Sequence, residues 1–399
     1  MPISSKVAEK IVVAGGGMVG AAAALSLARL GHPVTLIDRH RPQDGPRGLG
    51  IDIRNVALSP GSHGLLAQIE AWPARTAPYQ RMDVWEQWGA AGIQFDAKSM
   101  HRDELGWLVE VAELSEKLWS RLDESPLVNL IFGDIAAVGL ADHQVELTVV
   151  PPADSGSRET QIVPAELLLA ADGSNSSVRS LLGVATQSLP THQVALTTVV
   201  KTTCPHGSIA RQRFLLDGPL ACLPSVDPHI SSIVWSQSPA AGERRLNLSE
   251  HDFKEALGLA LEYRLGRIEA VAERFVFPLN QQLAETPLPH PRVVLLGDAF
   301  RVVHPLAGQG VNLGFEDIRH LLPYVAVQRT FDQPGLLSAY ARRRHRRSQA
   351  MIDLLGGLRQ IYAQASPAFA LARNVGVGWV NGQHWLKRKM MFEAMGLTD

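Results

Sequence analysis

Apolar and polar residues fall into distinct blocks along the first forty positions of the chain. Lys10–Ala14 and Pro33–Asp38 are short apolar runs of the kind that form buried parallel strands. Between them, Met18–Leu30 carries the small apolar residues of a closely packed helix, and Gly31 ends it. This order predicts a β-α-β unit at the start of the chain.

Similar blocks recur further along the chain. Helical periodicity returns at Val111–Leu122, and extended segments follow up to Val150. Leu167–Ala171 and Arg292–Leu296 are two more buried runs of the parallel type. We interpret Gly45–Gly64, which is crowded with glycine, proline and serine, as a loop leading into a short helix.

Residues 192–278 show a different pattern. Their extended runs predict a mostly antiparallel sheet with one helix near His251–Ala260, and the chain from Gly314 onward is largely helical. The predicted fold is α/β, with a discontinuous Rossmann-like nucleotide domain, an inserted mostly antiparallel sheet domain that binds substrate, and a helical C-terminus. We assign residues 1–75, 100–190 and 280–360 to the nucleotide domain, 76–99 and 191–279 to the substrate domain, and 361–399 to the C-terminal helical segment.

Glycines follow the first strand in the spacing G-x-G-x-x-G, at Gly15, Gly17 and Gly20. In such a turn the first glycine permits a tight bend, the second lets the backbone approach a pyrophosphate, and the third lets helix and strand touch. The following helix directs partial positive charge at that pyrophosphate. Asp38, at the end of the next strand, can accept hydrogen bonds from a ribose. The pattern predicts a dinucleotide site but does not separate FAD from NAD.

Two later motifs bear on that choice. Asp172-Gly173 ends a buried strand, although an ordinary strand-to-helix turn explains this pair equally well. Gly297-Asp298 ends another strand and leads into His304–Gly314 (HPLAGQGVNLG), where three glycines, a proline and two amides crowd the start of a helix. Backbone N–H groups there would face a flat, electron-rich ring that carries negative charge when reduced. A simple helix N-cap is the alternative interpretation.

Charge, cysteine and histidine content exclude several function classes. The net charge of −1 argues against a non-specific nucleic-acid binder. Cys204 and Cys222 form no close pair, so we expect neither a disulfide framework nor a dithiol centre, and a reducing cytoplasm fits best. The fourteen histidines contain no H-x-x-x-H or H-E-x-x-H pair, and we expect no catalytic metal.

Taken together, the three motifs resemble those of the group A flavoprotein monooxygenases. His304–Gly314 is similar to the branch that hydroxylates ring intermediates of ubiquinone biosynthesis, and Arg54–Ser59 (RNVALS), Asp217–Pro239 and Lys387–Leu397 resemble the same branch. The similarity covers nearly the whole chain. It points first to 2-polyprenylphenol hydroxylases and next to demethoxyubiquinone hydroxylases. It implies that the Rossmann-like domain binds FAD.

The resemblance also implies the co-reactants and the chemistry. NAD(P)H reduces FAD, O₂ adds to the reduced flavin as a C4a-hydroperoxide, and the distal oxygen is transferred to an electron-rich phenol. The chain has a single dinucleotide fingerprint, which suits this group because its nicotinamide has no Rossmann domain of its own. No catalytic acid or base carries over from the family, so the catalytic residues stay unknown.

Residue by residue, the resemblance gives a set of FAD contacts. Those of the adenosine and pyrophosphate half lie near the start of the chain: Gly15, Gly17, Gly20, Asp38, Arg39 and Arg54. Those of the flavin half come later: Asp172, Gly297, Asp298, Pro305, Ala307, Gly308, Gln309, Gly310, Val311 and Asn312. Asp38 would bind the adenosine ribose, Arg54 the pyrophosphate or the ribityl region, and Asp298 the ribityl chain.

Two positions depart from the family pattern. Arg301 stands where the family usually has a histidine, so a permanent charge replaces a titratable one. Val111 stands where an amide usually follows the glutamate, and this change removes a hydrogen bond typically worth about 1 kcal/mol. Either change could alter the kinetics or weaken the flavin site.

We therefore expect an FAD-dependent hydroxylase of a polyprenylated phenol in ubiquinone biosynthesis, acting at C5 of 2-polyprenylphenol. The alternatives are another ring position, a small soluble phenol, and a non-catalytic member of a biosynthetic complex, the last motivated by Arg301 and Val111. Leu215, Leu223 and Trp235 are candidates for the substrate pocket, although core packing is the better interpretation of each because the register of the sheet is not readable from sequence.

The C-terminal part of the chain carries a run of basic residues and two tryptophans. Six adjacent positions of Arg342–Arg347 (RRRHRR) go all round a helix, which favours a solvated face with intramolecular acidic partners over contact with anionic lipid headgroups. Trp379, Trp385 and Lys387–Met391 would add an interfacial anchor, because a polyprenylated substrate resides in the bilayer. A cytoplasmic protein, peripheral at the inner membrane, follows from that hypothesis. The oligomeric state is not readable from the sequence.

Overall fold

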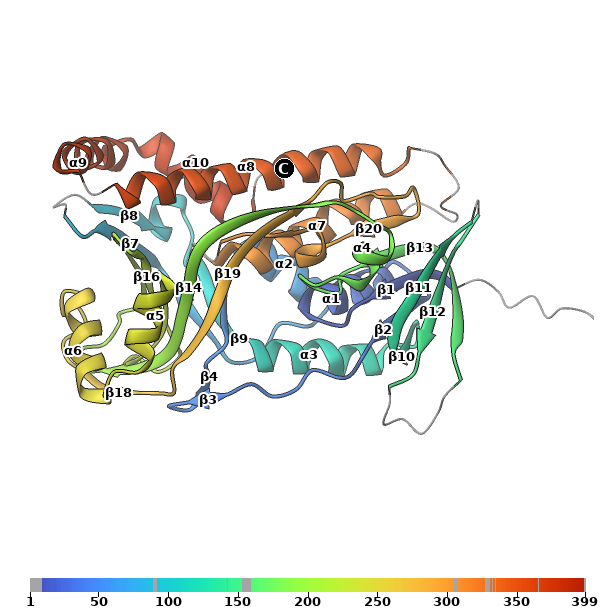
Figure 1. The fold of residues 1–399 in the computed structure, drawn as a ribbon, viewed down its shortest axis with the longest axis horizontal. Coiled ribbons are helices and arrows are strands. Elements are labelled where there is room, and N and C mark those ends of the chain that lie inside the picture. The colour runs from blue at the N-terminus through green and yellow to red at the C-terminus, as the bar shows by residue number, and fades with distance from the viewer. Residues whose placement is uncertain are drawn as a thin grey trace, which may run out of the picture.

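The computed structural model describes residues 9–88, 92–141, 143–152, 159–304, 308–326, 331, 333, 335–364 and 366–397. Two large sheets form the body of the molecule, and helices cover their faces (Figure 1). A three-stranded sheet, ordered β5-β9-β6, and a two-stranded ribbon of β3 and β4 complete the strands. These small elements are β3 (Arg47–Gly48), β4 (Ile51–Asp52), β5 (Asn55–Leu58), β6 (Thr76–Tyr79) and β9 (Gly106–Glu110).

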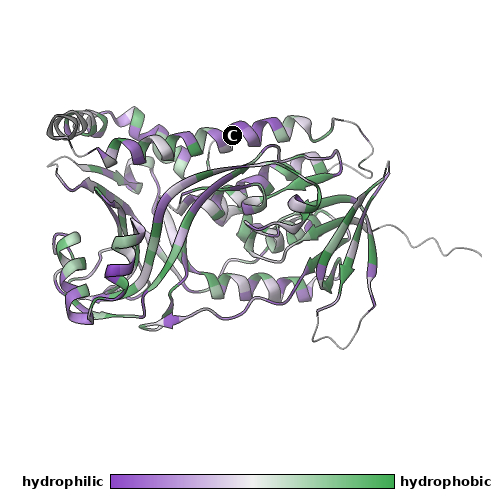
Figure 2. Ribbon diagram, in the orientation of Figure 1, coloured by the Kyte–Doolittle hydropathy of each residue, from purple (hydrophilic) through white to green (hydrophobic). Residues whose placement is uncertain are grey.

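The first sheet is built around the β-α-β unit that the sequence predicts. β1 (Glu9–Ala14) is parallel to β2 (Val34–Asp38) on one side and to β13 (Gln161–Ala170) on the other, and α1 (Met18–Arg29) joins β1 to β2. Alternate residues of β1 enter two different cores, which explains why its whole run is apolar. Figure 2 colours the strands of this sheet mostly green. Its other strands are β10 (Val128–Phe132), β11 (Asp134–Leu140), β12 (Val145–Val150) and β20 (Val293–Leu295).

The second sheet runs in the order β21-β19-β14-β17-β16-β15-β7-β8, with β18 beside β14. The pairings are antiparallel except that of β15 with β7. Its strands are β7 (Arg81–Glu86), β8 (Gly92–Asp96), β14 (Thr186–Thr202), β15 (Ile209–Leu215), β16 (Gly218–Pro224), β17 (Ile230–Gln237), β18 (Ile268–Val271), β19 (Phe275–Ala284) and β21 (Arg301–Val302). β14 and β19 extend beyond the 191–279 assigned to the substrate domain, and the domain division stays a prediction.

Three local expectations were wrong in detail. Gly45–Gly64 contains β3, β4 and β5 before α2 (Pro60–Gln68), because β5 pairs with β9 about fifty residues away and local patterning does not reveal such a partner. The extended runs that the sequence shows between 192 and 278 are Ala195–Thr203, Gln212–Leu216 and Ile230–Ser236, and they leave out β16 because Gly218 and two prolines resemble a turn. The last helical region begins earlier than Gly314, since α7 (Gln309–Val325) starts directly after Gly308, which has a φ of 62°.

Helices enclose both sheets. α5 (Pro239–Leu246) and α6 (Glu250–Ala260) contact the second sheet, whereas α7 contacts α1, and α9 (Pro367–Gly382) contacts β8. α8 (Ser338–Ala363) runs the length of the upper edge in Figure 1. The remaining helices are α3 (Val111–Glu124), α4 (Ser177–Leu181), α10 (His384–Ala394) and two 3₁₀ turns, η1 (Ala97–Met100) and η2 (Gly297–Ala299). Among the described residues, no helix is long and apolar enough to span a membrane.

Candidate functional site

The turn between β1 and α1 shows why its glycines are spaced as they are. Gly15 has a φ of 96°, and a Cβ there would lie 2.5 Å from the Ala171 carbonyl oxygen. A Cβ on Gly20 would lie 1.8 Å from the Gly15 carbonyl oxygen. Gly17, in contrast, has open space beside its Cα. Two glycines therefore let the chain pack on itself, and the third leaves the turn open to a ligand.

A cavity of about 340 Å³ extends from this turn to the ends of β2 and β10. Asp38 and Arg39 line it, and Oδ2 of Asp38 accepts a hydrogen bond from the Gly16 amide. The exposed Arg39 forms an ion pair with Asp134 at the same rim. Asp172 also lines the cavity, and its Oδ2 accepts from the Val178 amide at 3.1 Å. Its buried Oδ1 has no hydrogen-bond partner in the part of the chain that the structure describes.

A second cavity of about 440 Å³ shares Gly17, Ala171 and Gly173 with the first, so the two cavities adjoin, and we refer to them together as the trough. Its walls come from the glycine turn, β5, one face of the second sheet and the start of α7. Asp298 borders it, and burial raises the pKa of this carboxyl above its usual range. Gly308, Gly310 and Val311 form the α7 side of the cavity.

Asn312 fixes the position of α7 instead of facing this cavity. Its Nδ2 donates to the carbonyl oxygens of Ala57 at 2.8 Å and Gly308 at 2.9 Å. Its Oδ1 accepts from the Ser59 amide at 2.9 Å and from the Ser62 hydroxyl at 2.7 Å. The amide is thus used by the chain itself. Asn312 therefore positions the start of α7, and its predicted contact with FAD stays a prediction.

Arg54 contacts a neighbouring carboxylate of its own chain. Its guanidinium lies beside the Asp52 carboxylate, with Nε 3.7 Å from Oδ1, and lines neither cavity. The buried Asp52 accepts hydrogen bonds from the amides of Arg54 at 2.8 Å and Ala112 at 3.1 Å, and its own amide donates to Glu110 at 2.8 Å. Asp52 and Glu110, which sequence reasoning missed, secure the start of α3. The FAD contact of Arg54 stays a prediction.

The predicted contacts therefore separate into groups. The structure places most of them on the trough: Gly15, Gly17, Asp38, Arg39, Asp172, Asp298, Gly308, Gly310 and Val311. Gly20 and Gly297 shape the backbone beside it, because Val19 packs within 3.3 Å of a Cβ position on Gly297. Gln309 lies with Asn312 at a separate small cavity. Pro305 and Ala307 lie outside the described residues.

The basic run on α8 has the acidic partners that the favoured interpretation requires. Arg344, however, is buried instead of solvated, and its guanidinium lies 2.7 Å from both Glu316 and Asp317. Arg347 reaches Glu316 at 3.4 Å and forms an ion pair with Glu393 of α10. Burial alone would raise the pKa of Glu316, but the His320 hydrogen bond and the Arg344 charge lower it well below its usual range.

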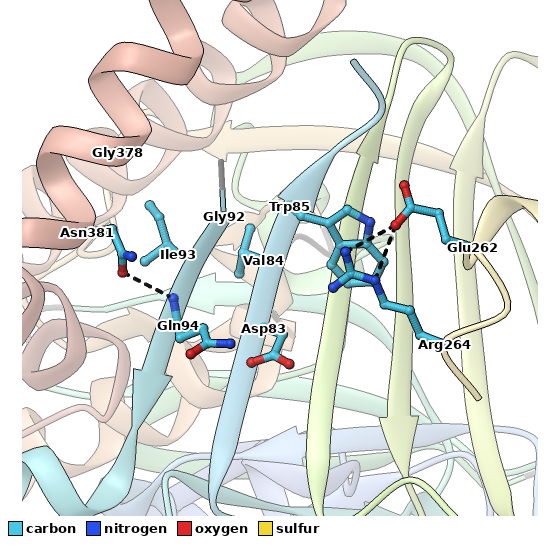
Figure 3. A pocket seen from close by; sticks show the side chains of 10 residues that line it. All are labelled: Asp83, Val84, Trp85, Gly92, Ile93, Gln94, Glu262, Arg264, Gly378 and Asn381. Atoms are coloured by element: carbon cyan, nitrogen blue, oxygen red, sulfur yellow. Dashed lines mark hydrogen bonds and ion pairs between the residues drawn. The ribbon is translucent and has the colours of Figure 1, made fainter. Parts of the chain in front are cut away.

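A separate cavity of about 650 Å³ lies between β7, β8 and α9 (Figure 3). Arg264 stacks over the Trp85 ring at 3.9 Å and pairs with Glu262 at 3.0 Å, while the Gln94 amide donates to Asn381 at 3.4 Å. None of its lining residues belongs to the nucleotide motifs, so we do not place FAD there. Among the described residues, no group of three potential metal ligands occurs.

Comparisons with known proteins agree with this geometry. A model of the FAD binding domain family matches residues 8–354. The chain is 32% identical to the 3-demethoxyubiquinol 3-hydroxylase of Escherichia coli (strain K12), with 97% of this chain and 98% of the relative covered. It is 30% identical to the ubiquinone hydroxylase UbiL of Rhodospirillum rubrum, with coverage of 98% and 90%. The crystal structure of p-nitrophenol 4-monooxygenase PnpA from Pseudomonas putida DLL-E4 superposes with a TM-score of 0.73 at 19% identity, covering 98% of both chains.

Proposed function

Because this chain belongs to the family of FAD-dependent monooxygenases that includes the ubiquinone-biosynthesis hydroxylases, we propose that it hydroxylates the ring of a polyprenylated phenol or quinol in ubiquinone biosynthesis. One oxygen atom of O₂ enters a ring C–H bond to give C–OH. The other leaves as water, with NAD(P)H and one proton supplying the two electrons and two hydrogens. C5 of 2-polyprenylphenol stays the first candidate position. The name of the relative that is 32% identical favours demethoxyubiquinol as the second.

The trough has the features that an FAD molecule requires. The start of α1 has no capping side chain and no acidic residue in its first turn, so its free N–H groups can face a pyrophosphate. Gly17 leaves room for that pyrophosphate, and Oδ1 of Asp172, which has no partner among the described residues, can accept a hydrogen bond from a hydroxyl group of FAD. Gly308 and Gly310 allow close approach of a flat ring at the α7 end. When bound, FAD supplies the reducing equivalents and the activated oxygen, whereas the chain orients the ring and excludes water.

The observation that carries the substrate class is the apolar sheet wall of the 440 Å³ cavity. Met82, Leu223 and Val234 contribute to that wall. Tyr79 and Met82 border both the cavity and an apolar cluster around Met100, Leu105, Met391 and Met395. A substrate whose aromatic ring lies near the start of α7 and whose prenyl tail runs toward the cluster around Met100 would match both the cavity and the cluster. A small polar phenol would leave most of the wall without a partner.

Mass spectrometry of quinone lipids, from a strain that lacks this gene and from the same strain carrying a plasmid copy, tests the proposal. We expect a prenylated intermediate short of one oxygen to accumulate and to disappear on complementation. The identity of this intermediate assigns the ring position. Accumulation of 2-polyprenylphenol would indicate C5, and accumulation of demethoxyubiquinol would indicate the second candidate. An unchanged lipid profile, in a strain without any second hydroxylase of this family, would remove the ubiquinone assignment.

We also propose that the C-terminal helices contact an anionic membrane surface from which the substrate enters. Asp353 and Glu393 are the only acidic residues of 338–397, a segment rich in arginine and lysine. Trp379 and Trp385 are 59% and 64% exposed there. Exposed tryptophan together with basic side chains is typical of interfacial binding.

Co-sedimentation with phosphatidylglycerol vesicles at moderate salt tests the membrane contact. We expect the double variant Trp379→Ser/Trp385→Ser to bind much less than the parent chain. Leu259→Ser is the matched control, because Leu259 is 63% exposed but lies on α6. Equal binding by all three proteins, or no binding by the parent, would count against this surface.

A further inference from the structure

One polar side chain interrupts the apolar sheet wall of the 440 Å³ cavity. Gln212 lies in the middle of β15, opposite Val84 of β7 and Ala221 of β16. Alternation along the strands puts it on the same face as the wall residues Met82, Ala210, Ala221, Leu223 and Val234. All of these line the 440 Å³ cavity, and among the described residues Gln212 is the one polar side chain that this face contributes to the wall.

The side-chain amide of Gln212 is buried without a partner. The residue is 5% exposed, and within the described part of the chain no hydrogen bond involves its amide group. Buried amides are normally paired, because leaving them unpaired costs free energy. The amide nitrogen and oxygen also do not appear among the atoms fully enclosed by protein. They therefore remain accessible from the cavity.

Of the other polar side chains at the cavity, Asp298 belongs to η2 and not to the sheet wall, and the remaining three have protein partners or point elsewhere. Nδ2 of Asn55 donates to the Asp52 carbonyl oxygen at 2.6 Å. Arg211, which the strand turns to the opposite face, donates to the His206 carbonyl oxygen at 2.9 Å. The Tyr79 hydroxyl is directed at Gly106, where it would lie 2.6 Å from a Cβ. Gln212 is left as the group on the sheet wall that is free to bind a ligand.

We propose that Gln212 recognises the ring oxygen of the substrate and thereby sets the orientation of the ring. A primary amide both donates and accepts, as a phenolic hydroxyl does, so the two can pair in either direction. A substrate ring that lies between the sheet wall and a flavin bound at Gly308–Val311 can direct its hydroxyl at this wall. This assignment rests on the proposed function. It adds that the enzyme selects phenols and quinols over ethers and unsubstituted arenes through this one amide.

The test is a binding titration of the oxidised holoenzyme without NAD(P)H, so that no turnover occurs. The ligands are 2-allylphenol, 2-allylanisole and allylbenzene, which share a short tail and differ in the ring oxygen. Dissociation constants come from the change in the FAD absorption spectrum. We expect the parent enzyme to bind the phenol about tenfold more tightly than allylbenzene, as expected for one buried hydrogen bond, with the anisole between them.

Gln212→Met keeps the unbranched shape of the side chain and removes the amide. We expect it to reduce the phenol preference to about twofold while leaving the affinity for allylbenzene unchanged or improved. Gln187→Met removes the same group at an exposed position of β14 that does not line this cavity, so it is the matched control and should keep the parent preference. Gln212→Leu is the second variant if the methionine variant does not retain FAD.

The outcomes distinguish a failure of the Gln212 assignment from a failure of the proposed function. If the Gln212 variants bind the phenol with the parent preference, the assignment of Gln212 is wrong while the phenol hydroxylase proposal stands. If all three ligands lose affinity equally, Gln212 has only a structural role and the assignment is again wrong. If none of the ligands perturbs the parent spectrum, the proposed function fails and the assignment fails with it.

Discussion

Arg301 and Asp317 form a buried ion pair in which Nη1 of the arginine lies 2.5 Å from Oδ2 of the aspartate. Their side chains are 2% and 0% exposed. Asp317 also accepts hydrogen bonds from Nε of Arg344 at 2.7 Å and from the Gly297 amide at 3.0 Å. The pair therefore ties the loop after β20 to α7 and α8. The arginine that departs from the family pattern is neutralised inside the fold and does not line the trough.

Arg301→Ala should destabilise the protein strongly. Removing one partner of a buried pair leaves a buried charge with less compensation, which typically costs about 3–5 kcal/mol. Urea unfolding of the FAD-loaded protein measures this loss. Lys201→Thr is the control, because Lys201 pairs with Glu269 at 3.6 Å on the surface and such a pair is worth at most about 1 kcal/mol. Similar small losses for both variants would show that Arg301 is not a structural charge.

Gly20→Ala should disrupt the nucleotide turn. The new methyl group would lie 1.8 Å from the Gly15 carbonyl oxygen, so β1 and α1 have to separate. We expect a loss of about 3 kcal/mol and a purified protein with much less FAD. The ratio of flavin to protein absorbance gives the FAD content.

Gly64→Ala is the matched control for this glycine. Gly64 lies within α2, and a Cβ there would meet no atom within 4 Å. Alanine in a helix interior should stabilise the protein by about 0.5–1 kcal/mol without changing its FAD content. If Gly20→Ala retains FAD as well as Gly64→Ala does, the close approach of helix and strand is not needed for the cofactor.

The elements that the sequence predicts best are those with local signals. β1, α1 and β2 follow from apolar runs and a glycine fingerprint within thirty residues of one another. β5 was missed because its partner β9 lies about fifty residues further on. The same limit applies to side-chain direction. Leu223 lines the cavity whereas Trp235 enters a core beneath α6, and only the register of β16 against β17 decides between the two.

The residues of the candidate site also divide into those with a local sequence signal and those that depend on long-range contacts. Gly15, Gly17 and Asp38 could be named from their spacing, because the backbone itself forms that part of the trough. The hydrogen bonds that Asn312 makes within the fold could not be predicted, since two of its partners, Ser59 and Ala57, lie more than 250 positions away. Gln212 carries no motif at all. Its role becomes visible only when the sheet face, the burial and the missing partner are known together.

Asn312→Ala should loosen the contact between α7 and β5. It removes the partners of the Ser59 amide and of the Ala57 carbonyl oxygen, both of which are buried in the fold. We expect a loss of about 2–3 kcal/mol on urea unfolding and weaker FAD binding. Asn280→Ala, at an exposed position of β19, should stay within about 0.5 kcal/mol of the parent. An Asn312 variant that loses FAD but no stability would indicate direct contact with the cofactor instead.

His304 should make the stability of the protein dependent on pH. Its ring is buried, and Nε2 lies 3.1 Å from Oε1 of Gln193, an oxygen that only accepts, so Nε2 carries the proton of a neutral ring. Burial lowers the pKa of His304 to about 4, and the Arg359 charge acts in the same direction. The unfolded chain, with an ordinary histidine pKa of about 6.5, therefore takes up this proton first as the pH falls.

The contribution of His304 is complete above about pH 6.5 and is lost progressively down to about pH 4, for a total of about 3 kcal/mol. His304→Gln carries a neutral amide that does not titrate, so the difference in unfolding free energy between the two proteins should shrink or reverse in favour of the variant over this range. Urea unfolding at half-unit pH steps measures that difference and cancels the contributions of other groups, such as His206. Parallel pH profiles for the two proteins would show that His304 is already charged, or already exposed, in the folded state. The hydrogen bond to Gln193 would then have to be assigned to the imidazolium form of His304.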